Sequence, residues 1–201
     1  IDGIDVTKLP EHKRAKYIGR VFQDPMNGTA ANMQIIENLA LASRRGAHRG
    51  LGPGVKHKEK EHYQELLKSL DLGLEDRLTS KVGLLSGGQR QAITLLMATM
   101  CKPKLLLLDE HTAALDPKTA KKVLDLTEKI VAENNLTTIM ITHNMKDAIA
   151  IGNRLIMMND GKIIYDVEGD EKKALTTADL LAKFKLTSGE ELDDDKILLS
   201  E

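Results

Sequence analysis

Three short stretches of the chain carry residue types that could act together on a phosphate group. Ser86-Gly87-Gly88-Gln89 has the pattern of a helix start, and bare backbone N–H groups at a helix N-terminus favour an anion. Asp109-Glu110 follows the apolar run Leu105–Leu108, and carboxylates at the end of a buried strand suit Mg²⁺ and the activation of water. His143 follows a second apolar run. Together they predict a site for a nucleoside triphosphate and its metal ion.

Each stretch also has an ordinary structural interpretation. Ser-x-x-Gln is a capping box, in which Ser86 caps the helix and Gln89 bonds back to the cap. The two glycines weaken that interpretation, because each costs about 1 kcal/mol inside a helix and a plain cap does not need them. A single histidine such as His143 is more often structural than catalytic, and most residues like Gln23 are simply solvated. The combination and order of the motifs therefore carry the chemical interpretation.

The elements that must position these residues follow from apolar periodicity. Strands and helices alternate along the chain, which predicts an α/β sheet with helices on both faces. Leu105–Leu108 has no polar alternation, as is typical of a parallel strand covered on both faces. The runs Ile18–Phe22 and Thr137–Thr142 are two further strands, with Gln23 and His143 at their carboxyl ends. Ligands bind at this edge in open α/β sheets.

The remaining elements are predicted from periodicity and from their end signals. Asp116-Pro117 predicts a helix start, with aspartate as the N-cap and proline in the first turn. Asp160-Gly161 predicts the turn of a β-hairpin. The other predicted helices are Glu11–Lys16, Gly28–Arg45, Lys56–Leu72, the segment after Gln89, Met145–Ile151 and Thr177–Lys185.

Composition excludes several classes of protein. The 201 residues are 41% hydrophobic and 29% charged, as in an ordinary globular domain. The net charge of -1 and the aromatic content of 2% argue against a nucleic-acid surface. Cys101 is the single cysteine, so no internal disulfide can form, which favours a reducing compartment. No apolar run approaches the ~18 residues that span a bilayer, so work at a membrane would need a partner.

The order and spacing of the motifs resemble those of the nucleotide-binding subunit of ABC transporters, over essentially residues 1 to 165. The resemblance implies an α/β fold: a P-loop NTPase-like ABC ATPase domain with a mostly parallel sheet and an inserted helical subdomain. The matching motifs are the Q-loop at Gln23, the signature at Leu85–Gln89, the Walker B aspartate Asp109 with the glutamate Glu110, the D-loop at Ala114-Leu115-Asp116 and the switch histidine His143.

The resemblance also implies a role for each matching residue. ATP would lie between the P-loop of one subunit and the signature of the other, in a head-to-tail dimer. The nucleotide-binding residues would be Leu85, Ser86, Gly87, Gly88, Gln89 and Asp116, the last at the dimer seam. Asp109 and Gln23 would hold Mg²⁺, mainly through water. Glu110 would act as general base or position the water, Gln23 would sense metal and water, and His143 would hold the γ-phosphate.

The function that the resemblance implies is ATP binding and hydrolysis that power solute transport through separate permease subunits. We interpret the chain as part of an importer of a small organic solute, such as an amino acid. It would be cytoplasmic, peripheral on the inner face of the cell membrane, and paired with an identical or a different ATPase subunit. Asp24–Met33 and the helical block would contact the permease. A substrate-binding protein stays open as a further partner, and nucleic acid is not expected.

Two other functions compete with this one. The first is a soluble ABC-type ATPase that acts on nucleic acid or the ribosome. The stretch between Gln23 and Ser86 is short and lacks sustained heptads, and there is only one signature, which argues against it. The second is a nucleotide-binding scaffold without turnover, against which the intact Glu110 and His143 argue.

The chain departs from the family pattern at two places. No Gly-x-x-x-x-Gly-Lys-Ser/Thr occurs in it, so we expect the P-loop and the rest of the N-terminal portion before Ile1. We expect these 201 residues alone to bind ATP poorly and to hydrolyse none. His111 stands where the family usually has proline, which would change the stiffness of the loop but leave Asp109 and Glu110 in place.

Four segments are predicted from these assignments. They are a partial ATPase core over 1–23, a helical signature subdomain over 24–103, a continued core with a C-terminal hairpin and helix over 104–188, and an acidic tail over 189–201.

Overall fold

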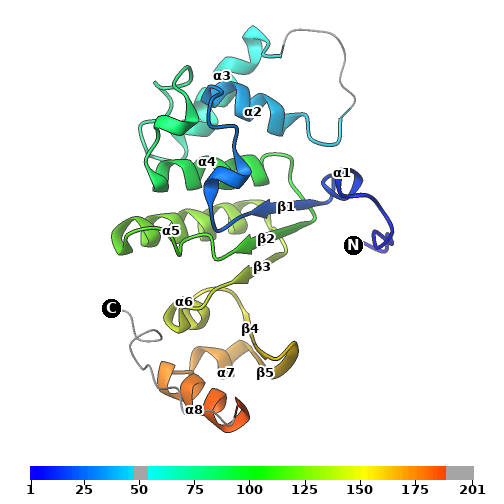
Figure 1. Ribbon diagram of the computed structural model, residues 1–201, viewed down its shortest axis with the longest axis vertical. Coiled ribbons are helices and arrows are strands. Elements are labelled where there is room, and N and C mark those ends of the chain that lie inside the picture. Colours follow the sequence, from blue (N-terminus) through cyan, green and yellow to red (C-terminus); the bar gives the residue numbers. More distant parts are fainter. Residues whose placement is uncertain (48–53, 189–201) are drawn as a thin grey trace. The chain divides into compact units, whose positions relative to one another are not determined.

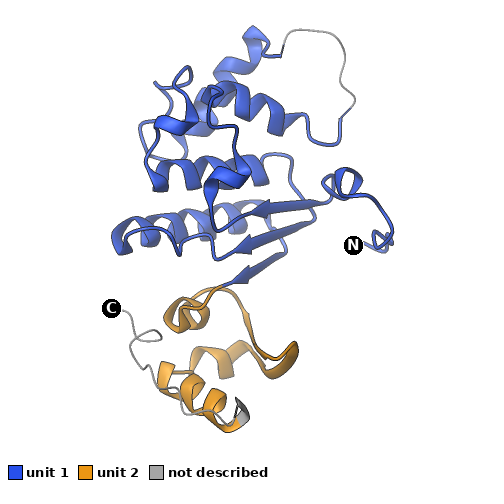
Figure 2. Cartoon of the chain, in the orientation of Figure 1, with its two compact units in different colours: residues 1–141 blue, residues 142–201 orange. Residues whose placement is uncertain are grey.

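The computed structural model describes residues 1–47 and 54–188, which fall into two compact units. Unit 1 is Ile1–Ile141 and unit 2 is Thr142–Glu201 (Figure 2). The predicted acidic tail over 189–201 lies outside the described residues. Within the described ranges, no helix has the length and apolar character needed to cross a lipid bilayer.

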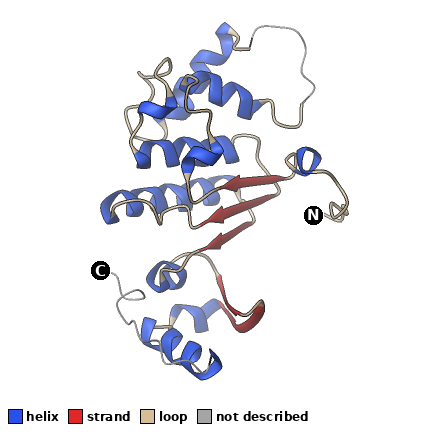
Figure 3. Ribbon diagram, in the orientation of Figure 1, coloured by secondary structure: helices blue, strands red, loops and turns tan. Residues whose placement is uncertain are grey.

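Unit 1 combines a parallel sheet with a set of helices (Figures 1 and 3). The sheet has the strand order β1-β2-β3, and all neighbouring strands are parallel. The strands are β1 (Ile18–Val21), β2 (Leu105–Asp109) and β3 (Thr138–Ile141). The helices are α1 (Glu11–Arg14), α2 (Ile35–Ser43), α3 (His57–Lys68), α4 (Gly87–Thr99) and α5 (Pro117–Asn134), with the 3-10 helices η1 (Pro25–Gly28) and η2 (Val82–Leu84).

The sheet buries the side chains of one face in the core of unit 1. Val21, Leu106 and Leu108 belong to one buried cluster with residues of α4 and with Ile130 of α5. Burial alternates along β2 between buried and half-buried residues. On β3, Ile139 and Ile141 are each 55% exposed. The unbroken apolar run of β2 predicted equal burial of both faces. In the described part of the chain the two faces differ, because the helices of this cluster pack on one of them.

Helix α4 lies between the sheet and the pair α2 and α3 (Figure 1). Its capping box is confirmed: the Gln89 N–H donates to Ser86 Oγ, and the Ser86 N–H donates to Gln89 Oε1, both at 3.3 Å. Strand β1 approaches α4 closely at Gly19, where an added Cβ would lie 2.5 Å from the carbonyl oxygen of Ala98. Glycine at this position therefore lets the strand and the helix touch.

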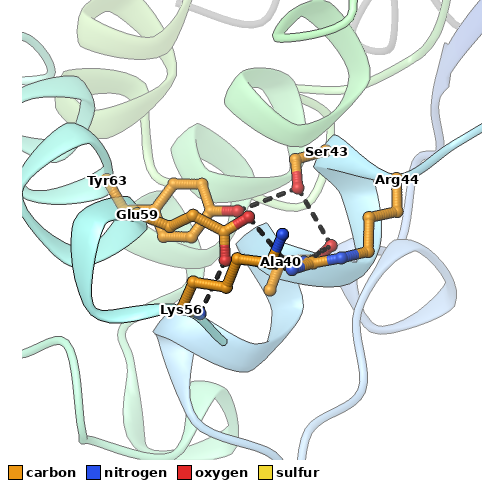
Figure 4. Close-up of polar contacts among 6 residues, drawn as sticks. All are labelled: Ala40, Ser43, Arg44, Lys56, Glu59 and Tyr63. Atoms are coloured by element: carbon orange, nitrogen blue, oxygen red, sulfur yellow. Dashed lines mark hydrogen bonds and ion pairs between the residues drawn. The ribbon is translucent and has the colours of Figure 1, made fainter. Parts of the chain in front are cut away.

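Polar contacts join α2 to α3 (Figure 4). Arg44 Nη2 donates to both carboxylate oxygens of Glu59, at 3.0 and 2.9 Å. Glu59 also accepts the backbone N–H of Lys56 at 2.7 Å, so the same carboxylate caps the start of α3. The buried Tyr63 hydroxyl lies 2.8 Å from Ser43 Oγ. These half-buried, charge-assisted bonds fix the two helices more firmly than exposed ion pairs would.

Two predicted helices differ from the structure by four or more residues at one end. The helix predicted from Gly28 begins only at Ile35, because the buried Asn38 side chain holds the preceding segment outside the helix. Asn38 Oδ1 accepts the N–H of Ala30 at 2.8 Å, and Nδ2 donates to the carbonyls of Ala30 and Gln34 at 3.1 and 2.9 Å. The helix predicted to end at Leu72 ends at Lys68 instead.

The predicted start of α5 is confirmed. Asp116 Oδ1 accepts the N–H of Thr119 at 3.1 Å, and Pro117 is the first helical residue. The helix ends at Asn134, and Asn135 follows it in the left-handed conformation with a φ of 50°. A left-handed residue is a common helix terminator, because its backbone turns the chain out of the helix.

Over residues 142–188, unit 2 contains the predicted β-hairpin and three helices. Its elements are α6 (Met145–Ala150), β4 (Arg154–Asn159), β5 (Lys162–Glu168), α7 (Gly169–Lys173) and α8 (Thr177–Ser188). The strands are antiparallel and turn at Asp160-Gly161, which confirms the predicted hairpin. Helix α7 was not predicted. It carries the buried Lys172, whose Nζ donates to the carbonyls of Ile149 and Ile151 at the end of α6.

Candidate functional site

Strands β1 and β2 end side by side and bring three of the predicted site residues to one edge of the sheet. The parallel register pairs Val21 with Leu108. Gln23 and Glu110 each lie two residues beyond that pair, just after the strands end at Val21 and Asp109. Asp109 is the last residue of β2. The structure therefore places Gln23, Asp109 and Glu110 at the carboxyl edge of the sheet.

Glu110 has a strained backbone. Its φ is 44°, in the left-handed region, where a residue other than glycine costs roughly 1–3 kcal/mol. Two hydrogen bonds hold this conformation: the N–H of Glu110 donates to the carbonyl of Ile141 at 3.0 Å, and its carbonyl accepts the N–H of Ala113 at 3.0 Å. The side chain of Glu110 is half-buried. Strain that the surroundings hold in place is typical of functional sites.

Asp109 has a cationic neighbour that the sequence analysis missed. Arg20 Nη2 donates to Asp109 Oδ2 at 3.1 Å, and the guanidinium lies 4.5 Å from the centroid of the Phe22 ring. The side chains of Arg20 and Asp109 are 49% and 39% exposed, so this ion pair contributes less than about 1 kcal/mol. The available signal was position, because Arg20 lies on β1, the strand that pairs with the strand carrying Asp109.

The oxygen donors at this edge are suited to Mg²⁺. Mg²⁺ is usually bound through one or two carboxylates together with waters and substrate phosphates. The carboxylate of Asp109 and the side-chain oxygen of the exposed Gln23 provide such donors. Within residues 1–47 and 54–188, no group of three or more histidine, cysteine or acidic side chains could enclose a metal ion. The donor set therefore fits an ion held mainly through water rather than a closed protein site.

The two glycines that begin α4 pack against the start of α5. A Cβ on Gly88 would lie closer than 3.0 Å to Cγ2 of Thr119, and a Cβ on Gly87 would lie 3.2 Å from Cδ2 of Leu115. Gly88 is buried, whereas Gly87 is exposed. The sequence pattern relates both glycines to ligand access, and the structure adds a packing reason. The contact also brings the start of α4 close to the helix that Asp116 caps.

The other predicted nucleotide-binding residues have distinct environments. Leu85 is buried in the core, so its side chain acts by packing, whereas Ser86 is exposed at the helix start. Gln89 is occupied by the capping box and by a bond from its Nε2 to the carbonyl of Leu72 at 3.3 Å. Asp116 is exposed, and the hydrogen bonds from Thr119 lower the pKa of its carboxyl group.

His111 is a buried residue whose place the sequence analysis did not predict. Its side chain is 2% exposed, and Nε2 lies 3.0 Å from Oγ1 of Thr127 on α5. The Thr127 hydroxyl donates its proton to the carbonyl of Val123 at 2.7 Å, so Nε2–H of His111 is the donor in the first bond. Burial lowers the pKa of His111 to about 4, which keeps the ring neutral at pH 7.

His143 belongs to unit 2, where it is exposed immediately before α6. The next residue, Asn144, caps that helix: Oδ1 accepts the N–H groups of Lys146 and Asp147 at 2.9 and 3.3 Å. Burial raises the pKa of Asp147, and the charge of His143 opposes that shift. Because His143 and Glu110 belong to different units, their meeting at one site stays a prediction.

Comparison with known proteins finds relatives that are named as ATP-binding proteins of transporters. The model of the ABC transporter family matches residues 1–113. A tyrosine transport ATP-binding protein of Clostridioides difficile (strain R20291) is 47% identical over 185 residues, which are 92% of this chain and 73% of that protein. A methionine import ATP-binding protein of Oceanobacillus iheyensis is 34% identical over 184 residues, which are 88% of this chain and 52% of that protein. This chain thus spans about half the length of the second relative.

A solved structure shows the same fold. It is a dimeric ATP-binding cassette in a post-hydrolysis state, bound to ADP and Pi. The likeness has a TM-score of 0.67 at 30% identity, and it covers 84% of this chain and 71% of that chain. This likeness confirms the fold class predicted from the sequence.

Replacing Gly88 with alanine should lower the free energy of unfolding by about 1–3 kcal/mol, because the new methyl overlaps Thr119 Cγ2. Adding Thr119→Ser, which removes that Cγ2 methyl, should restore most of the loss. Gly54→Ala is the matched control, since an added Cβ there meets no atom within 4 Å. Urea unfolding followed by circular dichroism measures all three. A Gly88→Ala protein as stable as the Gly54→Ala protein would contradict the packing explanation.

The buried His111 should make the fold sensitive to mild acid. The pKa of His111 is about 4 in the folded chain and near 6.5 in the unfolded chain, so its contribution is complete above pH 6.5 and is lost as the pH falls toward 4. Between pH 7.5 and 5, wild type should lose about 2 kcal/mol more stability than His111→Gln, which does not titrate. Urea unfolding at the two pH values tests this, and equal losses in the two proteins would refute it.

Proposed function

Because this chain belongs to the ABC transporter family and is an ATP-binding ATPase subunit of it, we propose that it powers the import of a small organic solute through separate permease subunits. The observation that carries the proposal is the 47% identity, over 92% of the chain, to a protein named for tyrosine transport. A second relative is named for methionine import. An amino acid is therefore the proposed class of solute, with tyrosine as the first candidate.

The proposed mechanism shares each ATP between two subunits in a head-to-tail dimer. The solved cassette that this fold resembles is a dimer bound to ADP and Pi, which supports a dimer as the working form. Ser86 and the first N–H groups of α4 contact the γ-phosphate of the ATP that the other subunit binds, where the helix N-terminus favours negative charge. Ser86 and Gly87 are exposed, as this contact requires, and the packing of Gly88 fixes the direction of the helix. Asp116 lines the dimer seam from the exposed start of α5.

Hydrolysis in this proposal takes place at the carboxyl edge of the sheet. Glu110 accepts a proton from the attacking water, or orients that water, and its left-handed backbone sets the direction of its side chain. Gln23 contacts the same water and the metal from the neighbouring strand, and His143 holds the γ-phosphate. Asp109 and Gln23 would hold Mg²⁺, mainly through water. The ion, when bound, offsets the negative charge of the phosphates.

We also propose where the partners bind. The segment 24–103 acts as the helical signature subdomain between the core segments 1–23 and 104–188, and Asp24–Met33 contacts the permease on the cytoplasmic face of the membrane. Asp24 supports this placement, because its Oδ1 accepts the N–H of Met26 at 2.8 Å and so orders the turn that follows Gln23. A substrate-binding protein would be a further partner of the importer, and the two ATPase subunits would be identical or closely related.

The shared site predicts that ATP controls dimerisation. Full-length protein with Glu110→Gln should hydrolyse ATP at least about 100-fold more slowly and should double its mass in light scattering only when Mg-ATP is present. Adding Ser86→Arg should abolish the dimer, because a bulky side chain fills the contact with phosphate. Ser69→Arg, at the exposed end of α3, is the matched control and should leave the dimer intact. A monomer under both conditions would contradict the shared site.

The proposed solute predicts a transport defect. Cells that lack this gene should lose most uptake of labelled tyrosine, roughly tenfold or more, and wild type but not Glu110→Gln should restore it. Labelled methionine, measured in parallel, tests the alternative amino acid. Unchanged tyrosine uptake with lost methionine uptake would reject the first candidate solute but leave the ATPase proposal standing.

A further inference from the structure

Two neighbouring residues at the end of β2 lie in opposite environments. Glu110 is half-buried at the edge of the sheet, whereas His111 is packed inside the core. The chain passes from the edge of the sheet into the core within one residue, because Glu110 has a φ of 44°. A glutamate does not favour this left-handed conformation, so contacts on either side must hold it there.

The contacts before and after Glu110 come from different parts of unit 1. On the strand side, the N–H of Glu110 is bonded to the carbonyl of Ile141 on β3 at 3.0 Å. On the other side, the ring of His111 reaches α5, where Nε2 donates to Oγ1 of Thr127 at 3.0 Å. Glu110 is therefore held between a strand and a helix that are distant from it in sequence.

Thr127 is a fixed acceptor for this bond. Its side chain is 3% exposed, in the middle of the 18-residue helix α5. Its hydroxyl proton is committed to the carbonyl of Val123 at 2.7 Å, which leaves the oxygen free to accept from His111. Val123 and Ile130, which precede and follow Thr127 on this helix, are buried as well. The hydrogen bond thus ties the residue after Glu110 to a rigid, packed element.

We infer that His111 is a positioning residue, which through its bond to Thr127 holds the carboxylate of Glu110 in the orientation needed to activate water. This inference rests on the proposed role of Glu110 in hydrolysis. The family usually has proline at this position, and a proline ring would restrict the backbone without making any bond to another element. In this chain a hydrogen bond to α5 takes the place of that restriction, so hydrolysis comes to depend on Thr127, which is buried in the core.

The test compares variants in the complete transporter complex by kcat, KM for ATP and melting temperature. Leucine at position 111 (H111L) and Thr127→Val each remove one partner of the bond. Each should lower kcat about tenfold, because a small misplacement of a catalytic group is costly, and each should leave KM within about twofold. Their combination should be no slower than either alone, since both remove the same interaction.

Two conservative variants serve as matched controls. His111→Gln places an amide nitrogen where Nε2 of His111 lies, and Thr127→Ser keeps the hydroxyl. Both should stay within about threefold of the wild-type kcat. If H111L does not fold, Thr127→Val with its Thr127→Ser control decides the question by the same criterion.

The outcomes separate this inference from the proposed function. Wild-type kcat in H111L and Thr127→Val, with only the melting temperature lowered, would show a purely structural role and overturn the inference alone. Wild-type kcat in Glu110→Gln would overturn the proposed role of Glu110, and the inference with it. A loss of kcat in Glu110→Gln, H111L and Thr127→Val, with rescue by His111→Gln, is the expected result.

Discussion

Helix α4 is approached by neighbouring segments so closely that only glycine fits at the points of contact. The contact residues are Gly19 of β1 against Ala98, Gly28 of η1 against Thr94, and Gly88 of α4 itself against Thr119 of α5. The opposing atoms belong to backbone or to β-branched side chains, which cannot rotate away from an added methyl. The sheet, the turn after Gln23 and the start of α5 are therefore fixed to one helix.

This constraint determines the geometry of the candidate site. Gln23 extends from a strand seated on α4, Ser86 begins α4, and Asp116 begins the helix that touches it. Glu110 is the exception, because it lies at the end of β2 and depends on contacts to β3 and α5 instead. Gln23, Ser86 and Asp116 are thus positioned by close glycine contacts, whereas Glu110 is positioned by buried hydrogen bonds.

Sequence patterns predicted the elements whose signals are local. The cap at Asp116-Pro117, the hairpin turn at Asp160-Gly161 and the box at Ser86 each depend on neighbouring residues, and each was confirmed. The late start of α2 was missed, because it depends on how Asn38 bonds to a segment that precedes its helix. The bond between Arg20 and Asp109 spans 89 residues in sequence, and that between His111 and Thr127 joins a loop to a helix. No local pattern marks such pairings, whereas motif order alone identified the family. The roles assigned to the site residues stay predictions.

The seating of η1 on α4 has a mechanical consequence. Gly28 leaves no soft side chain between the turn after Gln23 and Thr94, so that turn and the helix form one stiff body. Thr94 and Ser86 are eight residues apart on α4, a span of about 12 Å at the helical rise. Because the turn and the helix are in close contact at Thr94, a displacement of the turn is expected to move the helix, including the end that carries Ser86.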